Sequence, residues 1–493
     1  MGDDPTTQLA LLRLGGEITI KAPATRRQFV NRLLRNLGDA LLSEGAAPSI
    51  RRSHDRIFVE FPALDAGPIS GALSRVFGLQ SLSLVERRDV TSLDEIVGAG
   101  VELFRDAVRG RRFAVRARRV GNRQRIPSHS GDVERQLGAA LLPLAARVDL
   151  DHPEVTVHVE ILEGEVYFFP SRISGTGGMP LGTGGRALAL LSGGFDSAVA
   201  AWQMQKRGVG LDYVFCNLGG RTHEQGVLRV AKLLADRWSY GERPRLHAVD
   251  FEPISAELKK HTTMRYWQVL LKRQMLRVAD RIGDERDVVA LVTGEAVAQV
   301  SSQTLQNLAV ISAASARPVL RPLVGFNKDE IIALAERIGT FELSKVVGEY
   351  CAMVSSKPAT AASEAAILEE EAKLDASLLD AAVASRSVHD LRKLDTEAFG
   401  FPDLEVTEIP EGATVIDLRS KNEFASWHVE DALHLEFSKA LHAFPSFDAS
   451  QHYVLYCEIG LKSAHLAELM REHDLDAHHI RGGIRTLRKA AAP

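Results

Sequence analysis

Residues 187–206 read ALALLSGGFDSAVAAWQMQK, and this stretch decides the fold of the central part of the chain. The apolar run at its start predicts a buried strand, and the segment after Asp196 predicts a helix. The small residues between them, at 192–197, predict a tight loop whose backbone N–H groups and helix dipole suit a phosphate group. The loop is not of the Walker A type, because no Gly-Lys-Ser or Gly-Lys-Thr follows its glycines. The alternative is a tight turn in which a serine caps the helix.

Strands and helices alternate after this loop. We expect further strands within the stretches 211–218, 245–253, 287–295 and 319–326. Helices of this length between strands imply a doubly wound parallel sheet, in which ligands bind at the carboxyl ends of the strands. The sequence therefore predicts a nucleotide site around the loop at 192–197.

Other parts flank this region. Residues 8–60 have a strand, helix, strand pattern, and a second unit of helices and strands occupies 63–170. A polar, glycine-rich stretch at 171–185 separates them from the nucleotide region. Residues 361–395 predict helix, either as a packed arm or as a spacer. Residues 405–493 predict a small separate α/β domain.

The composition indicates a globular protein of about three or four domains, because 493 residues are too many for one hydrophobic core. Hydrophobic residues make up 45% and charged residues 25% of the chain. The formal net charge is only −4, so a nucleic-acid surface has to be local. No apolar run is long enough for a membrane span, and the acidic N-terminus lacks the features of a secretory signal. We therefore expect a cytoplasmic protein with no membrane partner.

Basic residues concentrate in one short segment. If 112–121 forms a strand, Val115 and Ala117 face inward while Arg116 and Arg118 face outward. Such a stripe can neutralise phosphates and position RNA without reading its bases, although most charge runs are only solvated surface. The arginines of this segment are Arg111, Arg112, Arg116, Arg118, Arg119, Arg123 and Arg125.

The three cysteines, Cys216, Cys351 and Cys457, are too few for a disulfide scaffold and too scattered for a zinc knuckle. Cys457 follows an apolar strand, and Gly460 and Ser463 lie before the next helix. Loop amides can then surround its sulfur, and the helix dipole can lower the pKa of the thiol, which stabilises a thiolate or persulfide. A buried structural cysteine is the alternative. Cys216 is most simply a core thiol, and so is Cys351 when it is considered alone.

The order strand, SGGFDS, helix resembles the PP-loop ATPases, which cleave ATP between the α and β phosphates and transfer AMP. The resemblance implies that the glycines approach the pyrophosphate, that the serines donate to its oxygens and that Asp196 helps to hold Mg²⁺. It implies that Lys272 neutralises phosphate charge and that Asp196 and Lys328 act in catalysis. The residues expected to bind the nucleotide are Leu190, Leu191, Ser192, Gly193, Gly194, Ser197, Phe215, Cys216, Lys272, Gly294 and Gln303.

Residues 113–141 resemble the core of a THUMP domain, which is characteristic of tRNA-modifying enzymes. The motif of that domain appears here as Ser130, Asp132, Val133, Glu134, Arg135 and Gly138. Asp132 can cap the helix that follows it, so much of the motif can be structural. The arginines are therefore the expected RNA contacts.

The C-terminal segments 414–424, 452–470 and 479–484 resemble a rhodanese domain. Its scaffold motif and catalytic cysteine are matched by Asp417, Arg419, Glu423, His428 and Cys457. The sequence departs from the usual pattern at Trp427, Asp431, Glu458 and Ile459. A carboxylate at Glu458 is unfavourable beside a persulfide anion unless it points away, and Lys462 offers partial compensation. These departures affect free rhodanese activity more than the presence of a persulfide carrier.

Taken in order, these units resemble the tRNA 4-thiouridine synthetase, or tRNA sulfurtransferase, family. The implied fold is an α/β and α+β multidomain one. Its domains are a ferredoxin-like domain at 1–62, a THUMP RNA-binding domain at 63–170, a PP-loop adenylation domain with a helical arm at 171–395 and a rhodanese domain at 405–493.

The resemblance also implies a reaction. ATP with Mg²⁺ adenylates O4 of a tRNA uridine, and a cysteine desulfurase loads sulfur onto Cys457. The persulfide then attacks C4 directly, or releases sulfide once Cys351 attacks it. A Cys351–Cys457 disulfide requires the two Cα atoms to come within about 7 Å. Sulfur supply to the carrier protein of thiamine thiazole synthesis is a further implied role, and a homodimer is one option for the oligomeric state.

Two other classes of function stay open from sequence. One is a different PP-loop enzyme, such as an amidating or lysidine-forming ligase, against which the THUMP and rhodanese resemblances argue. The other is a persulfide relay or RNA-binding protein with a vestigial ATP site, against which the intact SGGFDS argues.

Overall fold

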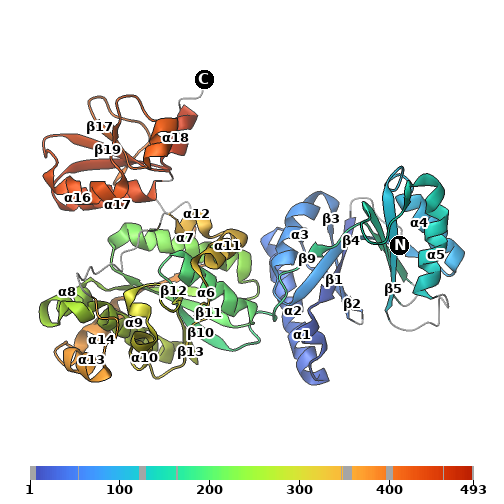
Figure 1. Cartoon of the computed structure of the whole chain (residues 1–493), viewed down its shortest axis with the longest axis horizontal. Coiled ribbons are helices and arrows are strands. Elements are labelled where there is room, and N and C mark those ends of the chain that lie inside the picture. Colours follow the sequence, from blue (N-terminus) through green and yellow to red (C-terminus); the bar gives the residue numbers. More distant parts are fainter. Residues whose placement is uncertain are drawn as a thin grey trace. The chain divides into compact units, whose positions relative to one another are not determined.

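The chain is described by a computed structural model over residues 7–53, 55–120, 129–162, 165–345, 347, 358–395, 403–458 and 460–490. It divides into two compact units, which Figure 1 colours along the sequence. The first unit contains residues up to 184 with short segments at 206–208 and 240–242, and the second contains the remainder. Within the described ranges, no helix is both long and apolar enough to cross a membrane.

The first unit is built on one nine-stranded sheet of order β2-β3-β1-β4-β8-β7-β5-β6, with β9 paired to β4. Its strands are β1 (Thr7–Leu14), β2 (Ser49–Ser53), β3 (Arg56–Pro62), β4 (Leu79–Asp89), β5 (Arg112–Val120), β6 (Arg147–Val148), β7 (Val155–Leu162), β8 (Glu165–Phe169) and β9 (Ile173–Ser174). Its helices are α1 (Gly16–Thr19), α2 (Pro23–Ser43), α3 (Ala66–Arg75), α4 (Leu93–Phe104) and α5 (Ser130–Leu141).

Strand β4 joins the two halves of this sheet. Its first part pairs antiparallel with β1, from Leu79 to Val85, and its last four residues pair antiparallel with β8. The sheet that begins at β1 therefore continues past residue 62. The short pattern at 8–60 contains β1 to β3 but not the strand that completes their pairing.

A buried ion-pair cluster lies inside the first unit. Glu160 on β7 accepts hydrogen bonds from Arg13, at 3.0 Å, and from Arg56, and Arg13 also donates to Ser83 at 3.1 Å. The three charged side chains are almost fully buried. Burial lowers the pKa of Arg13, and the Glu160 carboxylate opposes that effect. The cluster is stable only while the carboxylate compensates both guanidinium groups.

Replacing Glu160 with alanine is therefore expected to destabilise the first unit strongly. Removing one partner of a buried ion pair leaves uncompensated charge and typically costs about 3–5 kcal/mol. Urea unfolding followed by circular dichroism measures this free energy. Glu154→Gln is the matched control, because Glu154 pairs with Arg112 on the exposed surface. Equal stability of the two variants would contradict the prediction.

The second unit contains the six-stranded sheet of order β14-β13-β10-β11-β12-β15. Its strands are β10 (Arg186–Leu190), β11 (Gly210–Asn217), β12 (Arg245–Asp250), β13 (Ala290–Val292), β14 (Val319–Leu320) and β15 (Ser387–Asp390). Its helices are α6 (Phe195–Lys206), α7 (Gly220–Trp238), α8 (Glu252–His261), α9 (Trp267–Arg286), α10 (Leu305–Ser312), α11 (Lys328–Ile338), α12 (Phe341–Ser344), α13 (Glu364–Glu371) and α14 (Ser377–Ser385). β10 to β14 are mutually parallel, which confirms the predicted doubly wound sheet.

The helical segment after the nucleotide region is a packed arm. Glu371 at the end of α13 accepts hydrogen bonds from Arg273, at 2.8 and 2.9 Å, and from Gln274 and Arg277 of α9. The prediction of helix holds for α13 and α14 but is wrong for β15, which pairs antiparallel with β12. The short β15 segment covers the edge of β12, and an unpaired strand edge is otherwise a site for unwanted pairing.

The C-terminal part of the second unit is a parallel five-stranded sheet of order β16-β20-β19-β17-β18. Its strands are β16 (Glu405–Val406), β17 (Thr414–Asp417), β18 (Leu433–His434), β19 (His452–Tyr456) and β20 (Asp476–Ile480). Its helices are α15 (Lys421–Ser426), α16 (Phe437–Ala443), α17 (Leu461–Glu472) and α18 (Ile484–Ala490). The small α/β domain expected here is present, and β19 leads directly to Cys457.

Candidate nucleotide, RNA and sulfur sites

The loop after β10 is shaped by its own serines and glycines. Ser197 Oγ donates to the Gly194 carbonyl at 3.1 Å and accepts the Ser192 backbone N–H at 3.2 Å. Gly193 has φ +81, and a Cβ placed there would lie 2.9 Å from Val347. A left-handed residue in that space has to be glycine. The loop at 192–197 is therefore preformed at the strand end where this sheet type binds ligands.

Asp196 and Lys328 are far apart in sequence but meet at this loop. Lys328 Nζ donates to Asp196 Oδ1 at 2.8 Å, and Gln299 Nε2 donates to Oδ2 at 2.8 Å. Lys328 is the first residue of α11, where the helix is held by a capping box of Asn327 and Glu330. Gln299 is a polar partner that sequence reasoning missed, since nothing in its local pattern marks it.

A second charged group lies next to the loop. Glu295, 7% exposed, accepts hydrogen bonds from Lys272 Nζ at 2.8 Å, Arg321 Nε at 2.8 Å and Thr293 Oγ1 at 3.1 Å. Burial opposes ionisation of Glu295, but its ion pairs with Lys272 and Arg321 outweigh burial and lower the pKa. Lys272 was expected near phosphate, whereas Glu295 and Arg321 were missed. Their signal is a charged residue just after a buried strand, at the edge where ligands bind.

The strand β13 ends directly against the loop. A Cβ on Gly294 would lie 2.6 Å from the backbone of Asp196 and Ser197, so only glycine allows this approach. The sheet order places β13 beside β10, while the chain runs from β10 to β11 in the other direction. The gap between β10 and β13 is therefore the topological switch point, where open α/β sheets bind their ligands.

The remaining residues that were expected to bind the nucleotide differ in the burial of their side chains. Leu190 and Cys216 are half-buried, whereas the side chains of Leu191 and Phe215 are buried in the core. A nucleoside could meet Leu191 and Phe215 only through their backbone. Gln303 is also buried, and its Oε1 makes no hydrogen bond within the described residues.

The arginines of β5 divide by their contacts. Arg116 and Arg118 are exposed while Val115 is buried, as the strand alternation predicted. Arg112 is engaged by Glu154 at 3.1 Å, and Arg116 donates to the Leu150 carbonyl at 2.6 Å. Among the described residues, Arg111 and Arg118 make no ion pair. Arg119 is half-buried, and Arg123 and Arg125 lie outside the described residues.

The acidic residues of the motif on α5 have structural roles. Asp132 accepts the His129 backbone N–H at 3.0 Å and so caps the helix, as expected from the sequence. Glu134 accepts the Ala117 N–H at 2.8 Å, which ties α5 to β5. Val133 is fully buried. These residues hold the arginine-bearing strand in place.

Cys457 occupies a turn between β19 and α17. Its Sγ accepts the Gly460 N–H at 3.3 Å and the Ser463 hydroxyl at 3.5 Å. Gly460 has φ +93, and a Cβ on Gly483 would lie 2.3 Å from the Cys457 carbonyl, so both positions require glycine. Ser463 lies in the first turn of α17 rather than in the loop before it. Cys457 is 2% exposed, and its sulfur lies at the positive end of α17.

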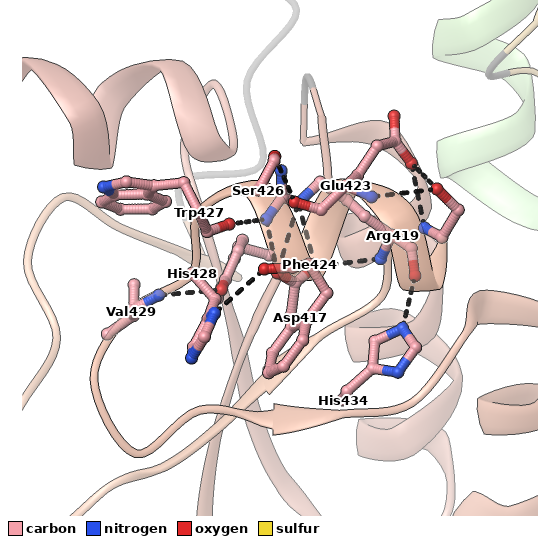
Figure 2. A network of polar contacts seen from close by, with 11 residues as sticks. Asp417, Arg419, Glu423, Phe424, Ser426, Trp427, His428, Val429 and His434 are labelled. Carbon is pink, nitrogen blue, oxygen red and sulfur yellow. Dashed lines mark hydrogen bonds and ion pairs between the residues drawn. The ribbon is translucent and has the colours of Figure 1, made fainter.

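Figure 2 shows a polar network around the end of β17 and α15, in the same domain as this turn. Arg419 donates to Asp417 Oδ2 at 2.6 Å and to the Trp427 carbonyl at 2.6 Å. Its guanidinium also lies 5.7 Å from the ring centre of Tyr456, the residue before Cys457. Glu423 caps α15 through Ser420, and the His428 ring stacks on Phe424. Within the described part of the chain, none of these residues forms a hydrogen bond with the sulfur.

Two departures from the rhodanese pattern are accommodated by the backbone. Trp427 has φ −170, an extended conformation that any residue adopts, whereas Asp431 has φ +61 and takes the left-handed form usual for glycine. Lys462 Nζ lies 5.7 Å from the Phe437 ring centre, and within the described residues it forms no ion pair with Glu458. Ile459 and Cys351 lie outside the described residues, so the expected pairing of Cys351 with Cys457 stays a prediction.

Four family models match successive parts of the chain. They are the ThiI ferredoxin-like domain at 9–83, the THUMP domain at 90–169, the thiamine biosynthesis protein ThiI at 182–376 and the rhodanese-like domain at 405–490.

Whole-chain relatives agree with these matches. The chain is 35% identical over 480 residues to a tRNA sulfurtransferase of Pyrobaculum aerophilum, covering 96% of both chains. It is 37% identical to a tRNA sulfurtransferase of Yersinia enterocolitica, covering 94% of this chain and 97% of that one.

Two solved structures resemble large parts of the chain. A 4-thiouridine synthetase in complex with RNA and bound ATP is 30% identical with a TM-score of 0.67, covering 78% of this chain and 99% of that one. The protein PH1313 of Pyrococcus horikoshii is 24% identical with a TM-score of 0.54, covering 67% of this chain and 99% of that one. The second likeness concerns the fold alone.

Proposed function

The chain belongs to the tRNA sulfurtransferase family, and we propose that it uses ATP to replace O4 of a tRNA uridine with sulfur, giving 4-thiouridine. The observation that most supports sulfur transfer is the Cys457 turn, where a buried sulfur accepts one backbone N–H and one hydroxyl at a helix N-terminus. Such a site stabilises an anionic sulfur, the form in which a persulfide is nucleophilic. The likeness to an ATP-bound 4-thiouridine synthetase supports the ATP half of the proposal.

The first step takes place at the loop after β10. Uridine O4 attacks the α-phosphorus of ATP, the bond to pyrophosphate breaks, and the uridine becomes O4-adenylated. The amides of Gly193 and Gly194 and the dipole of α6 receive phosphate oxygens. Lys328 and Lys272 offset the charge that develops on the leaving pyrophosphate.

The residues at the loop fit a Mg²⁺ ion. Asp196 is a hard oxygen donor, 25% exposed, beside the proposed phosphate position, and among the described residues its oxygens accept hydrogen bonds from Lys328 and Gln299. Mg²⁺ typically binds through one or two carboxylates together with substrate phosphates. When bound, the ion would neutralise phosphate charge, with Asp196 as its protein ligand.

The second step uses Cys457. A cysteine desulfurase transfers sulfur to the thiolate, and the terminal sulfur of the persulfide attacks C4 of the uridine while AMP leaves. A thiolate at Cys351 then attacks Cys457 Sγ, which breaks the S–S bond, frees 4-thiouridine and forms a disulfide that a thiol reductant must reopen. In the alternative, Cys351 attacks the persulfide first, and the released sulfide attacks C4.

We assign RNA binding to the THUMP domain, with Arg118 as the residue to test because, like Arg111, it is exposed and makes no ion pair among the described residues, and it lies within β5. Arg118→Ala is expected to weaken tRNA binding evenly across sequences and to reduce the salt dependence, the slope of log K against log salt, by about 1. Filter binding at several salt concentrations measures both quantities. Arg105→Ala, an exposed arginine outside β5, is the control, and an unchanged slope for Arg118→Ala would exclude a phosphate contact.

A role in thiamine synthesis is a second candidate, because the family model at 182–376 describes a thiamine biosynthesis protein. The same Cys457 persulfide would then pass sulfur to the carrier protein of thiazole synthesis.

One assay tests the main proposal. Unmodified tRNA is incubated with the protein, ATP, Mg²⁺, cysteine and a cysteine desulfurase, then digested and examined for 4-thiouridine by chromatography. ATP-dependent appearance of the thionucleoside is expected. Its absence, or equal amounts without ATP, would overturn the proposal.

A further inference from the structure

Arg321 follows β14 at the same sheet edge as the loop at 192–197. Val292 of β13 pairs with Leu320 of β14, so the residues just after these two strands emerge side by side at their carboxyl ends. Arg321 is one of these residues, and Glu295 follows three positions after Val292. The topological switch point between β10 and β13 is next to these strand ends. Arg321 and Glu295 therefore lie at the edge of the sheet where proteins of this topology bind their ligands.

The Arg321 side chain is held rigidly by two of its three nitrogens. Nε donates to Glu295 Oε2 at 2.8 Å, and Nη1 donates to Ser312 Oγ at 2.9 Å. Ser312 in turn donates to the Leu308 carbonyl at 2.7 Å, which fixes the orientation of its hydroxyl. The planar guanidinium is therefore pre-oriented before any ligand arrives.

The third nitrogen of the Arg321 guanidinium, Nη2, does not help to hold the side chain. Nη2 is buried and makes no hydrogen bond with any described residue. A buried charged N–H group without a partner is costly, and such a group in a native fold calls for an explanation. An anion bound next to it would supply the acceptor.

The local charge also favours an anion. Glu295 is the only carboxylate in contact with both Lys272 and Arg321 among the described residues, so two cations share one negative charge. The excess of one positive charge is held at a nearly buried position, where an electrostatic interaction is weakly screened. A free cation pair would repel, and Glu295 keeps the two side chains together in the absence of ligand.

We propose that Arg321 is an anion-binding residue that receives, through Nη2, an oxygen of the pyrophosphate part of ATP, with Glu295 holding Arg321 and Lys272 in position. The inference rests on the proposed function, since it deepens the account of the ATP site. Glu295 is a positioning residue, because it acts through the two cations. The α-phosphate and the nucleoside are left to the loop and the backbone around it.

The test compares three probes on the full chain by isothermal titration calorimetry: pyrophosphate, ATP and AMP, each with MgCl₂. Arg321→Lys keeps the charge beside Glu295 but has no Nη2 donor. Loss of one hydrogen bond to a charged group is expected to weaken pyrophosphate and ATP binding about 10- to 100-fold. AMP binding is expected to remain unchanged, because AMP lacks the β and γ phosphates.

Arg317→Lys is the matched control. Arg317 precedes β14 at the opposite edge of the sheet, and its nitrogens donate to the Val288 carbonyl, Asp280 and Asp284. The Arg317→Lys variant is expected to bind all three probes with the same affinity as the unaltered protein. Thermal melting of both variants checks that each retains the fold.

The outcomes separate this inference from the proposed function. Equal binding of pyrophosphate by Arg321→Lys and the unaltered protein would overturn the inference. So would an equal loss for AMP, which would place Arg321 at the α-phosphate. Failure of the unaltered protein to bind ATP at all would instead overturn the proposed function.

Discussion

Cys457→Ser is expected to form no 4-thiouridine above the level seen without protein, while ATP-dependent release of AMP and pyrophosphate continues. Serine keeps a hydrogen-bond acceptor facing the Gly460 N–H and the Ser463 hydroxyl, so the turn can retain its shape. Serine cannot carry a persulfide, because sulfur is transferred by attack of a thiolate on the donor's persulfide, and a serine hydroxyl does not take part in this exchange. Sulfur transfer and ATP use are thus predicted to separate at this one atom.

The measurement uses radiolabelled cysteine and a desulfurase to follow sulfur on the protein and in the tRNA. The internal control is AMP formation by the same variant with unmodified tRNA and Mg-ATP. Ser426→Ala, which removes a hydroxyl outside the turn, should transfer sulfur normally, since the Ser426 Oγ donates to the Glu423 carbonyl and, among the described residues, forms no hydrogen bond with the turn. Loss of both sulfur transfer and AMP formation in Cys457→Ser would mean that the cysteine is structural.

Lys328→Ala is expected to slow adenylation about 100- to 1000-fold. Removal of a pre-oriented group that stabilises developing charge typically costs this much, and Lys328 is fixed against Asp196 at 2.8 Å and over the Phe195 ring. Its loss also leaves the Asp196 carboxylate without its cation near the phosphates of ATP. Single-turnover release of labelled pyrophosphate measures the rate.

Lys373→Ala is a matched control for this variant. The side chains of Lys373 and Lys328 are 42% and 43% exposed, and each contacts a carboxylate, but Lys373 pairs with Glu370 on the helical arm. Adenylation by Lys373→Ala should match that of the unaltered protein. Equal rates for Lys328→Ala and Lys373→Ala would remove Lys328 from the catalytic residues.

Local pattern was enough to predict the central sheet and the position of its loop. The strand, small-residue loop and helix at 187–206 require only nearest-neighbour chemistry, and the alternation that follows imposes parallel pairing. The meeting of Asp196 with Lys328 depends on contacts across more than a hundred residues, and it was expected only through family resemblance. Glu295 and Arg321 were missed for the same reason, because the role of each depends on a contact with a residue from another element.

Two features of the sheets were not visible in the local sequence, and they share a cause. β15 is a four-residue segment after two helices, too short for its alternation to be visible, and it is a strand because β12 offers a free edge. The place of β4 in the sheet is likewise not visible in its own sequence, because its pairing with β1 is a tertiary contact. In both places the partner strand, and not the segment's own sequence, determines the structure.

The sharing of β4 limits how this protein can be divided or recombined. Since one strand is hydrogen-bonded to β1 along its first part and to β8 along its last, a fragment that starts at residue 63 loses the β1 partner and presents a bare strand edge. Bare edges recruit other chains. The strands from β1 to β9 therefore form one continuous sheet, and an exchange of its THUMP half between relatives would have to preserve the pairing of β4 with both β1 and β8.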